Sequence, residues 1–241
     1  MWLFGVDGIF IYSPDGQELK VKHEPSRICG PKEEHEGPSH RYCRFSDIVS
    51  DGKKYVWGAI DRGKPTIDVF DIDTAALVGS FDTCANAERI EYHSLRDEIW
   101  VRCSSSDNEV SSQSNLDVFS ASNPSGDIQT DILAKERALE EGLSSRGYAV
   151  IDSSLGDIGY LTDSELPNLF KIDLSQKTIV DKVELSPLSN GLYEAVYSPV
   201  NKHIFIRSVV CCSCGFEGAD LGEECGRSPG APVSPVTGSS A

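Results

Sequence analysis

Four cysteines near the C-terminal end are the sharpest group of reactive side chains: Cys211, Cys212, Cys214 and Cys225. Cys211 and Cys214 have the C-x-x-C spacing that can place two thiolates on one zinc ion, but a tetrahedral site prefers a second such pair. A redox-active C-x-x-C opens a helix in a βαβ unit, and no such unit is evident. Disulfide bonds in a surface loop are the favoured interpretation, with zinc binding left open.

The other four cysteines lie earlier in the chain, at Cys29, Cys43, Cys84 and Cys103. Eight cysteines against one methionine favour an oxidising compartment, in which disulfide bonds persist. Local spacing suggests Cys29–Cys43 and Cys84–Cys103 bonds, although connectivity is not readable from sequence alone. Buried free thiols in a cytosolic protein are the alternative.

Clustered acids are the next candidates, because carboxylates ligate calcium: Asp61, Asp68, Asp71 and Asp73. An EF-hand needs a glycine at its sixth position and a glutamate at its twelfth, and this segment lacks both. The segment from Asp152 to Asp163 fails in the same way. Strand alternation would place Asp71 and Asp73 on one face, but solvated turn acids are the favoured interpretation.

The histidines are scattered over the chain: His23, His35, His40, His93 and His203. Two of them share the acidic loop PKEEHEGPSH (31–40), where a solvated linker is favoured over weak metal binding. No G-x-S-x-G, H-E-x-x-H or phosphate-cradling glycine loop occurs. The sequence therefore assigns no catalytic, cofactor-binding or metal-ligating residue, and we expect no cofactor.

The composition excludes some partners. Asp and Glu total 38 against 22 Lys and Arg, a net charge of −16. Proteins that bind nucleic acid through phosphates show a basic face, so we expect no nucleic-acid partner. Cationic partners suit an acidic surface, and its acids could bind calcium weakly. No apolar run approaches the roughly 18 residues of a membrane span, and Met1–Tyr12, with Asp7 and no cleavage site, is not a signal peptide.

A repeat of about 45 residues organises the chain. Four segments hold a strand rich in β-branched and aromatic residues: KKYVWGA (53–59), DEIWVRC (97–103), DIGYLTD (157–163) and KHIFIRS (202–208). Their aromatic residues recur at spacings of 43, 60 and 45: Trp57, Trp100, Tyr160 and Phe205. Each segment follows an earlier strand and turn: SDIVSDG (46–52), RIEYHSLR (89–96), YAVIDSSLG (148–156) and EAVYSPVN (194–201).

Third and fourth strands follow in the first three repeats. The third strands are TIDVFDID (66–73), NLDVFSAS (115–122) and NLFKIDLS (168–175). The fourth are AALVGSFD (75–82), DIQTDIL (127–133) and TIVDKVEL (178–185). The connecting residues are typical of hairpin turns. Residues 8–22 predict another hairpin, which turns at Pro14-Asp15-Gly16.

Four antiparallel strands in about 45 residues are the unit of a β-propeller blade. We expect an all-β β-propeller of WD40- or YVTN-like four-stranded blades, with three complete blades and partial ones. A β-sandwich is the alternative, but the strands of a β-sandwich are not expected to repeat one four-strand sequence pattern. A propeller closes its ring. Either the N-terminal hairpin joins the C-terminal strands in a fourth blade, or the chain is part of a larger ring, which we favour.

The longest repeat contains the one expected helix, within Asp131–Gly147, as an insertion between blades. We assign residues 1–225 to the propeller or propeller fragment. Residues 226–241 are rich in Gly, Pro and Ser and predict a loop or tail. Trp2, Trp57 and Trp100 are expected to pack between blades.

Four segments carry a resemblance to a known family: RYCRFSDIVSDGKKYVWGA (41–59), TIDVFDIDTAALVGSFDT (66–83), RIEYHSLRDEIWVRC (89–103) and LFKIDLSQKTIVDKVEL (169–185). From Tyr42 to Val210 the chain resembles the C-terminal propeller region of the long follistatin-related proteins. The resemblance implies a secreted, non-enzymatic protein with extracellular or matrix partners. The family's calcium-binding modules do not occur here, so its calcium binding is not carried over.

Two classes of function follow. The first is a secreted, non-enzymatic propeller that mediates extracellular protein or matrix interactions, with an acidic, biomineral-associated matrix protein as a variant. The second is a metal-dependent propeller hydrolase or lactonase, which needs metal ligands at equivalent strand starts. The strand starts do not repeat such a set: Asp47, Arg89, Tyr148 and Glu194.

Overall fold

The computed structural model describes most of the repeat region, namely residues 2–5, 8–12, 15, 19–23, 44–61, 66–84, 87–103, 115–130, 132, 148–163, 167–185 and 192–208. The expected helix, apart from Ile132, and the residues after Ser208 lie outside this part of the chain. Among the described residues, no helix is long and apolar enough to cross a membrane.

The described residues form five antiparallel sheets, numbered in chain order. The first holds β1 (Trp2–Gly5), β2 (Gly8–Tyr12) and β3 (Leu19–His23). The second holds β4 (Arg44–Ser50), β5 (Tyr55–Asp61), β6 (Thr66–Asp71) and β7 (Leu77–Asp82). The third holds β8 (Ala87–His93), β9 (Glu98–Cys103) and β10 (Asn115–Ser120). The fourth holds β11 (Ala149–Val150), β12 (Ile158–Thr162), β13 (Asn168–Asp173) and β14 (Thr178–Glu184), and the fifth β15 (Leu192–Ser198) and β16 (His203–Ser208).

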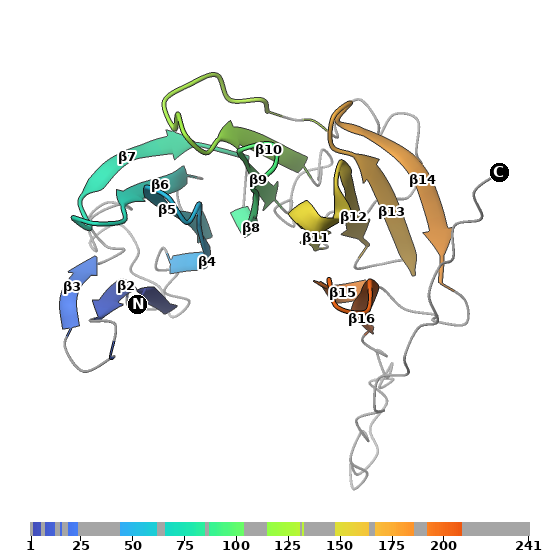
Figure 1. Cartoon of the computed structure of the whole chain (residues 1–241), viewed down its shortest axis with the longest axis horizontal. Coiled ribbons are helices and arrows are strands. Elements are labelled where there is room, and N and C mark those ends of the chain that lie inside the picture. The colour runs from blue at the N-terminus through green and yellow to red at the C-terminus, as the bar shows by residue number, and fades with distance from the viewer. Residues whose placement is uncertain are drawn as a thin grey trace, which may run out of the picture.

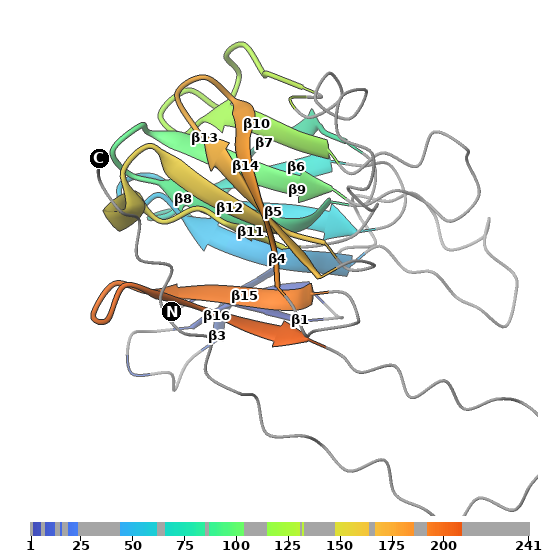
Figure 2. The ribbon, with the colours of Figure 1, turned by 90° about the vertical axis from the view of Figure 1, so that its right-hand side faces the viewer.

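The sheets follow one another around an arc, with the first strand of each on the concave side and the last on the outside (Figure 1). Seen at a right angle, the strands run roughly along the axis of the arc (Figure 2). The predicted β-propeller is confirmed. The first and fifth sheets lie at opposite ends of the arc, and β2–β3 pair with β1 rather than with β15–β16.

The third sheet departs from the four-strand repeat. The described residues of its expected fourth strand, 127–133, make one isolated bridge, between Val118 and Gln129, and the Ile132 N–H donates to the Leu116 carbonyl oxygen. The segment carries Asp127, Gln129 and Thr130, only one of which favours strands, and it follows a Pro124 turn. The other predicted strands form with ends shifted by a few residues, and the N-terminal hairpin is confirmed as β2 and β3.

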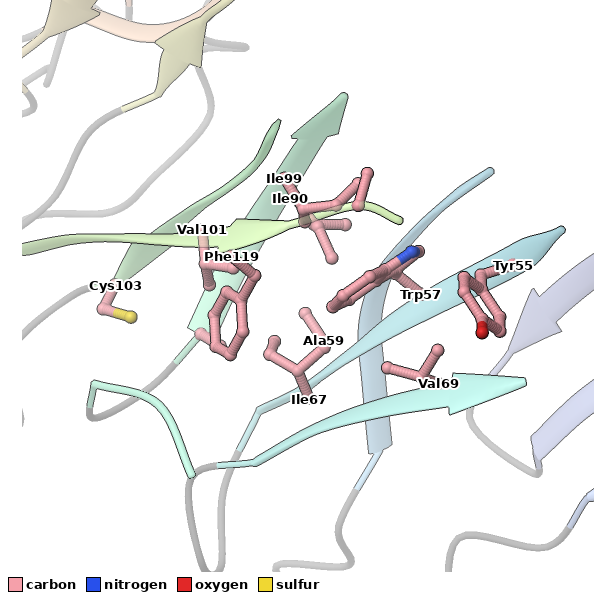
Figure 3. Close-up of a cluster of buried hydrophobic side chains, with 12 residues drawn as sticks. Tyr55, Trp57, Ala59, Ile67, Val69, Ile90, Ile99, Val101, Cys103 and Phe119 are labelled. Carbon is pink, nitrogen blue, oxygen red and sulfur yellow. The ribbon is translucent and has the colours of Figure 1, made fainter. Parts of the chain in front are cut away.

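The hydrophobic core lies between successive sheets. Alternation puts Trp57 on the face of the second sheet that meets the third, where its ring centroid lies 5.9 Å from that of Phe119 (Figure 3). Trp100 holds the same register in the third sheet and packs among side chains of the fourth, including Leu161 and Phe170. Trp2 contacts Phe70 across the first two sheets, at 6.0 Å. The prediction that the tryptophans pack between blades is confirmed.

Candidate functional site

The structure contains one of the two predicted local disulfides. Cys84, just after β7, bonds to Cys103, at the end of β9, with the Cα atoms 5.8 Å apart. The other six cysteines lie outside the described residues: Cys29, Cys43, Cys211, Cys212, Cys214 and Cys225. The Cys29–Cys43 bond and the choice between disulfides and zinc in the C-terminal group stay predictions.

The acids around β6 cap turns or lie buried in a sheet. The Asp71 carboxylate accepts hydrogen bonds from the Thr74 N–H and hydroxyl, each at 2.8 Å. Asp173 accepts hydrogen bonds from Ser175 and Gln176 in the equivalent turn two repeats later. These donors hold the pKa of both carboxyls below the ordinary value. They fix the tight turns whose last residues, Ala75 and Lys177, adopt left-handed φ angles of 58° and 57°.

The remaining acidic residues considered above lie at separate places in the fold. Asp68 is fully buried, accepts a hydrogen bond from the Ser80 hydroxyl, and has a pKa raised by burial to about 6. Asp152 caps the short 3-10 turn η3 (Ser153–Leu155). Asp163 lies buried beyond the far end of β12. Asp61 is the last residue of β5 and Asp73 is exposed in the turn that Asp71 caps.

The described histidines are dispersed as well. His93 is buried, and its Nε2 lies 2.7 Å from the Gly156 carbonyl oxygen of the next sheet. His203 stacks edge-on against Phe205, and His23 ends β3. His35 and His40 lie outside the described residues. Within the described ranges, no group of three or more His, Cys, Asp or Glu residues could hold a metal ion.

Four side chains from four sheets occupy one register on the concave side. Val49, Glu91, Val150 and Val196 pair with the aromatic residues Trp57, Trp100, Tyr160 and Phe205. Two residues before each valine or glutamate lie the predicted strand starts, which we call the inner layer: Asp47, Arg89, Tyr148 and Glu194. The repeat therefore aligns one polar or aromatic side chain from each sheet.

Arg89 connects the inner layer. Its Nη1 lies 3.7 Å from Asp47 Oδ2, and its Nη2 lies 4.0 Å from Glu194 Oε1. The guanidinium also stacks on the Tyr148 ring, 4.5 Å from the centroid, a cation–π contact. Arg207 pairs with the other Glu194 oxygen at 3.4 Å. The layer thus joins the second to fifth sheets through opposite charges.

Burial controls the protonation of the carboxyls near this layer. It raises the pKa of Asp47, against the opposing effects of the Ile90 N–H and of Arg89. It raises the pKa of Glu91 to about 7, and the neighbouring charge of Asp47 adds to the shift. Glu91 therefore exchanges a proton near neutral pH.

The hairpin turns gather at one end of the sheets, to the left in Figure 2. We call this the turn face and define it by residues 51–54, 72–76, 94–97, 121–127, 151–157, 174–177 and 199–202. A pocket of about 240 Å³ opens among residues of the third and fourth sheets. Its walls include Arg96, Glu98, Asp127, Gln129 and Lys177.

Glu98 organises the pocket. Its Oε2 accepts hydrogen bonds from Arg96 Nε at 2.8 Å and from the Trp100 indole N–H at 3.2 Å. Its Oε1 lies 3.5 Å from Lys177 Nζ, which also donates to Gln129. Arg96 also forms a salt bridge with Asp157 of the fourth sheet, in which Nη1 lies 3.0 Å from Oδ1. Because carboxylates pair with the cationic side chains, the pocket walls are polar but carry no strong surplus of positive or negative charge.

Further contacts tie the turns of adjacent sheets. Lys53 of the second sheet pairs with Asp97 of the third at 3.0 Å. The Ser94 N–H donates to the Ser153 hydroxyl of the fourth sheet at 2.7 Å. The turn face is therefore one connected surface across three sheets. Sequence reasoning missed this network, although the recurring strand register indicates which turns are neighbours.

The comparisons with known proteins bear on the fold. The chain matches no protein-family model, and no curated protein matches it. It is similar to a chain in the crystal structure of a mitotic checkpoint complex, with a TM-score of 0.59 and 8% identity, covering 86% of this chain and 53% of that one. The chain thus spans about half of that neighbour, and at such an identity the likeness shows the fold alone. The five sheets and this likeness identify the chain as a β-propeller.

Proposed function

We propose that the protein is a non-enzymatic interaction scaffold that binds another polypeptide on its turn face. The observation that carries this proposal is a pair of exposed apolar residues at equivalent turn tips. Leu95, in the β8–β9 turn, is 73% exposed, and Val200, in the β15–β16 turn, is 94% exposed. Apolar side chains held out at repeated turn positions suit contact with a protein surface.

The turn face also has the stiffness that a binding surface needs. Leu95 is flanked by Ser94, which bonds to Ser153, and by Arg96, which bonds to Glu98 and Asp157. A tip fixed on both sides loses little conformational freedom when a partner binds. The net charge of −16 favours a partner with a basic surface.

The extracellular setting is part of this proposal. The Cys84–Cys103 disulfide supports it, because such bonds persist in oxidising compartments. The partner in this proposal is a protein or a matrix, and the matrix includes a mineralised one in which surface acids bind calcium. The proposal also includes membership of the follistatin-related proteins, which the sequence resembles.

The inner layer supports the non-enzymatic part. A metal-dependent propeller hydrolase would use carboxylates such as Asp47 and Glu194 as ligands. Here the Arg89 guanidinium lies between them and engages both. A cation at that position repels a divalent metal. Metal analysis of the purified protein and of Asp47→Asn/Glu194→Gln tests this, and one tightly held stoichiometric metal ion that this variant loses would contradict it.

The binding proposal is tested with a charge-bearing variant of the tips. The Leu95→Asp/Val200→Asp protein and the wild type are immobilised and exposed to conditioned medium, and retained polypeptides are quantified by mass spectrometry. Val78→Asp is the matched control, since Val78 is 49% exposed on the outer strand β7. We expect a polypeptide retained by the wild type and control and lost by the double variant. If every retained polypeptide binds all three proteins equally, the turn face is not the binding surface.

A further inference from the structure

The third sheet lacks a regular fourth strand, and a pocket opens where that strand would pair. In the described residues that follow β10, one isolated bridge joins Val118 to Gln129. Antiparallel register then places Asp127 opposite Ser120, and both residues line the pocket of about 240 Å³. In the second and fourth sheets, β7 and β14 pair along the equivalent third strands. The pocket therefore lies where regular strand pairing stops.

The turn that precedes Asp127 is held by hydrogen bonds. The Ser122 N–H donates to the Asp97 carboxylate at 3.1 Å. The Gly126 N–H donates to the Asn123 carbonyl oxygen at 3.0 Å. A ligand that meets Asp127 therefore has little of this turn to order, and the entropic cost of binding is small.

The charges in and around the pocket cancel in pairs, with one exception. The ion pairs join three carboxylates, Glu98, Asp97 and Asp157, to three cations, Arg96, Lys53 and Lys177. Asp127 is exposed and takes part in no ion pair within the described ranges. The pocket therefore carries one uncompensated negative charge, on an accessible side chain.

The paired groups are less accessible than Asp127. The side chains of Glu98 and Lys177 are 15% and 17% exposed, and that of Arg96 is 24% exposed. An anion would have to displace Glu98 from both cations and leave its carboxylate without a partner, which is costly. A cation needs no such rearrangement, because the Asp127 carboxylate is free to accept it. The pocket therefore selects a cationic ligand.

We propose that the pocket receives an arginine side chain of the polypeptide partner, whose guanidinium pairs with the Asp127 carboxylate. The inference rests on the proposed function and adds a residue of the partner to it. A guanidinium donates two parallel hydrogen bonds to a carboxylate and is more weakly hydrated than an ammonium. Its methylene stem suits apolar surroundings, and the lining includes Val118 and Phe119. The volume lies below the roughly 300–1,000 Å³ of sites for drug-sized molecules, so it suits a single side chain.

The test uses the whole chain and N-acetyl-arginine amide as the probe. N-acetyl-citrulline amide, a neutral compound of nearly equal shape, is the control ligand. Binding is followed by nuclear magnetic resonance in residues 118–129 and in the side chains of Arg96 and Gln129, which line the pocket. We expect the arginine probe to shift these signals and the citrulline compound to leave them unchanged.

Asp127→Asn removes the charge and keeps the shape of the side chain. It should weaken binding of the probe about fivefold, as expected for an exposed ion pair, and added salt should weaken binding to the wild type. Asp73→Asn is the matched control, since Asp73 is an exposed carboxylate on the turn face of the second sheet, and it should bind the probe as the wild type does. Equal binding of the citrulline compound, or equal affinity of all three proteins for the probe, would overturn the inference.

The conditioned-medium experiment separates this inference from the proposed function. Retention of the partner should fall for Asp127→Asn and not for Asp73→Asn. A partner lost by Leu95→Asp/Val200→Asp but fully retained by Asp127→Asn would remove this inference alone. Binding of the probe at Asp127, with no polypeptide lost by the tip variant, would remove the proposed function and with it the polypeptide as the source of the guanidinium.

Discussion

Deprotonation of Glu91 should lower the stability of the protein as the pH rises through neutrality. Burial and the nearby Asp47 raise the pKa of this carboxyl from 4.5 to about 7. Between these values the folded protein holds a proton that the unfolded chain has released, so folding is favoured at the acidic end. Stability from this group is complete below pH 4.5 and is lost as the pH passes through about 7. Glu91→Gln, neutral at every pH, removes the effect.

The magnitude follows from the shift. At about 1.4 kcal/mol for each pKa unit, the change from 4.5 to about 7 corresponds to about 3 kcal/mol in the free energy of unfolding. The wild type therefore loses up to this amount relative to Glu91→Gln between pH 4.5 and pH 8. Asp68, whose pKa burial raises to about 6, acts in the same direction in both proteins and cancels in the comparison.

Urea unfolding at half-unit steps over this range, with the disulfide intact, measures the difference. Glu184→Gln is the control, because Glu184 is an exposed carboxylate on the outer strand β14. We expect the control to follow the wild type and Glu91→Gln to diverge from it as the pH rises. Parallel curves for all three proteins would show that Glu91 does not titrate near neutrality, and the account of its burial would be wrong.

Two further predictions concern the disulfide and the tryptophan packing. Cys84→Ala/Cys103→Ala opens a loop with a sequence separation of 19 and should lower the free energy of unfolding by about 3 kcal/mol. Reductant should cost the wild type about this much more than it costs the variant, and equal sensitivity of both would contradict the assignment. Trp100→Ala should cost about 3–5 kcal/mol, because Trp100 is buried. Phe205→Ala, at the matching exposed position, should cost about 1 kcal/mol or less, and equal losses in chemical denaturation would show that the fifth sheet is covered in solution.

The repeat made the fold predictable, because each strand carries its signal locally. Trp57 and Trp100 lie in short runs of apolar residues that follow a turn, and the recurrence of turn and aromatic residue fixes strand and register. Residues 127–133 mislead because their short apolar pattern also suits a segment whose described residues meet β10 at one isolated bridge and one further backbone hydrogen bond, from Ile132 to Leu116. The Cys84–Cys103 bond was predictable from the short distance along the chain between two adjacent elements.

The candidate sites were harder to predict, because they depend on contacts between sheets. Asp47, Arg89 and Glu194 are recognisable as strand starts, but their pairing requires the curvature of the arc. Glu98 offers no sequence signal for its contacts with Lys177 and Arg96, which come from different turns. Asp71 was predicted to be a turn acid rather than a cation ligand, and the structure places it in a turn, but only the turn geometry shows its oxygen engaged by Thr74.

The Cys84–Cys103 bond has a mechanical consequence. It joins the second residue after β7 to the last residue of β9, so β8 and most of β9 lie inside a covalent loop. Tension applied to the two ends of the chain passes through the sulfur atoms and bypasses these strands. Without the bond, the 19-residue separation could extend from 5.8 Å to roughly 65 Å. The centre of the arc therefore resists stretching for as long as the bond is oxidised, and a reducing environment would convert it into an extensible segment.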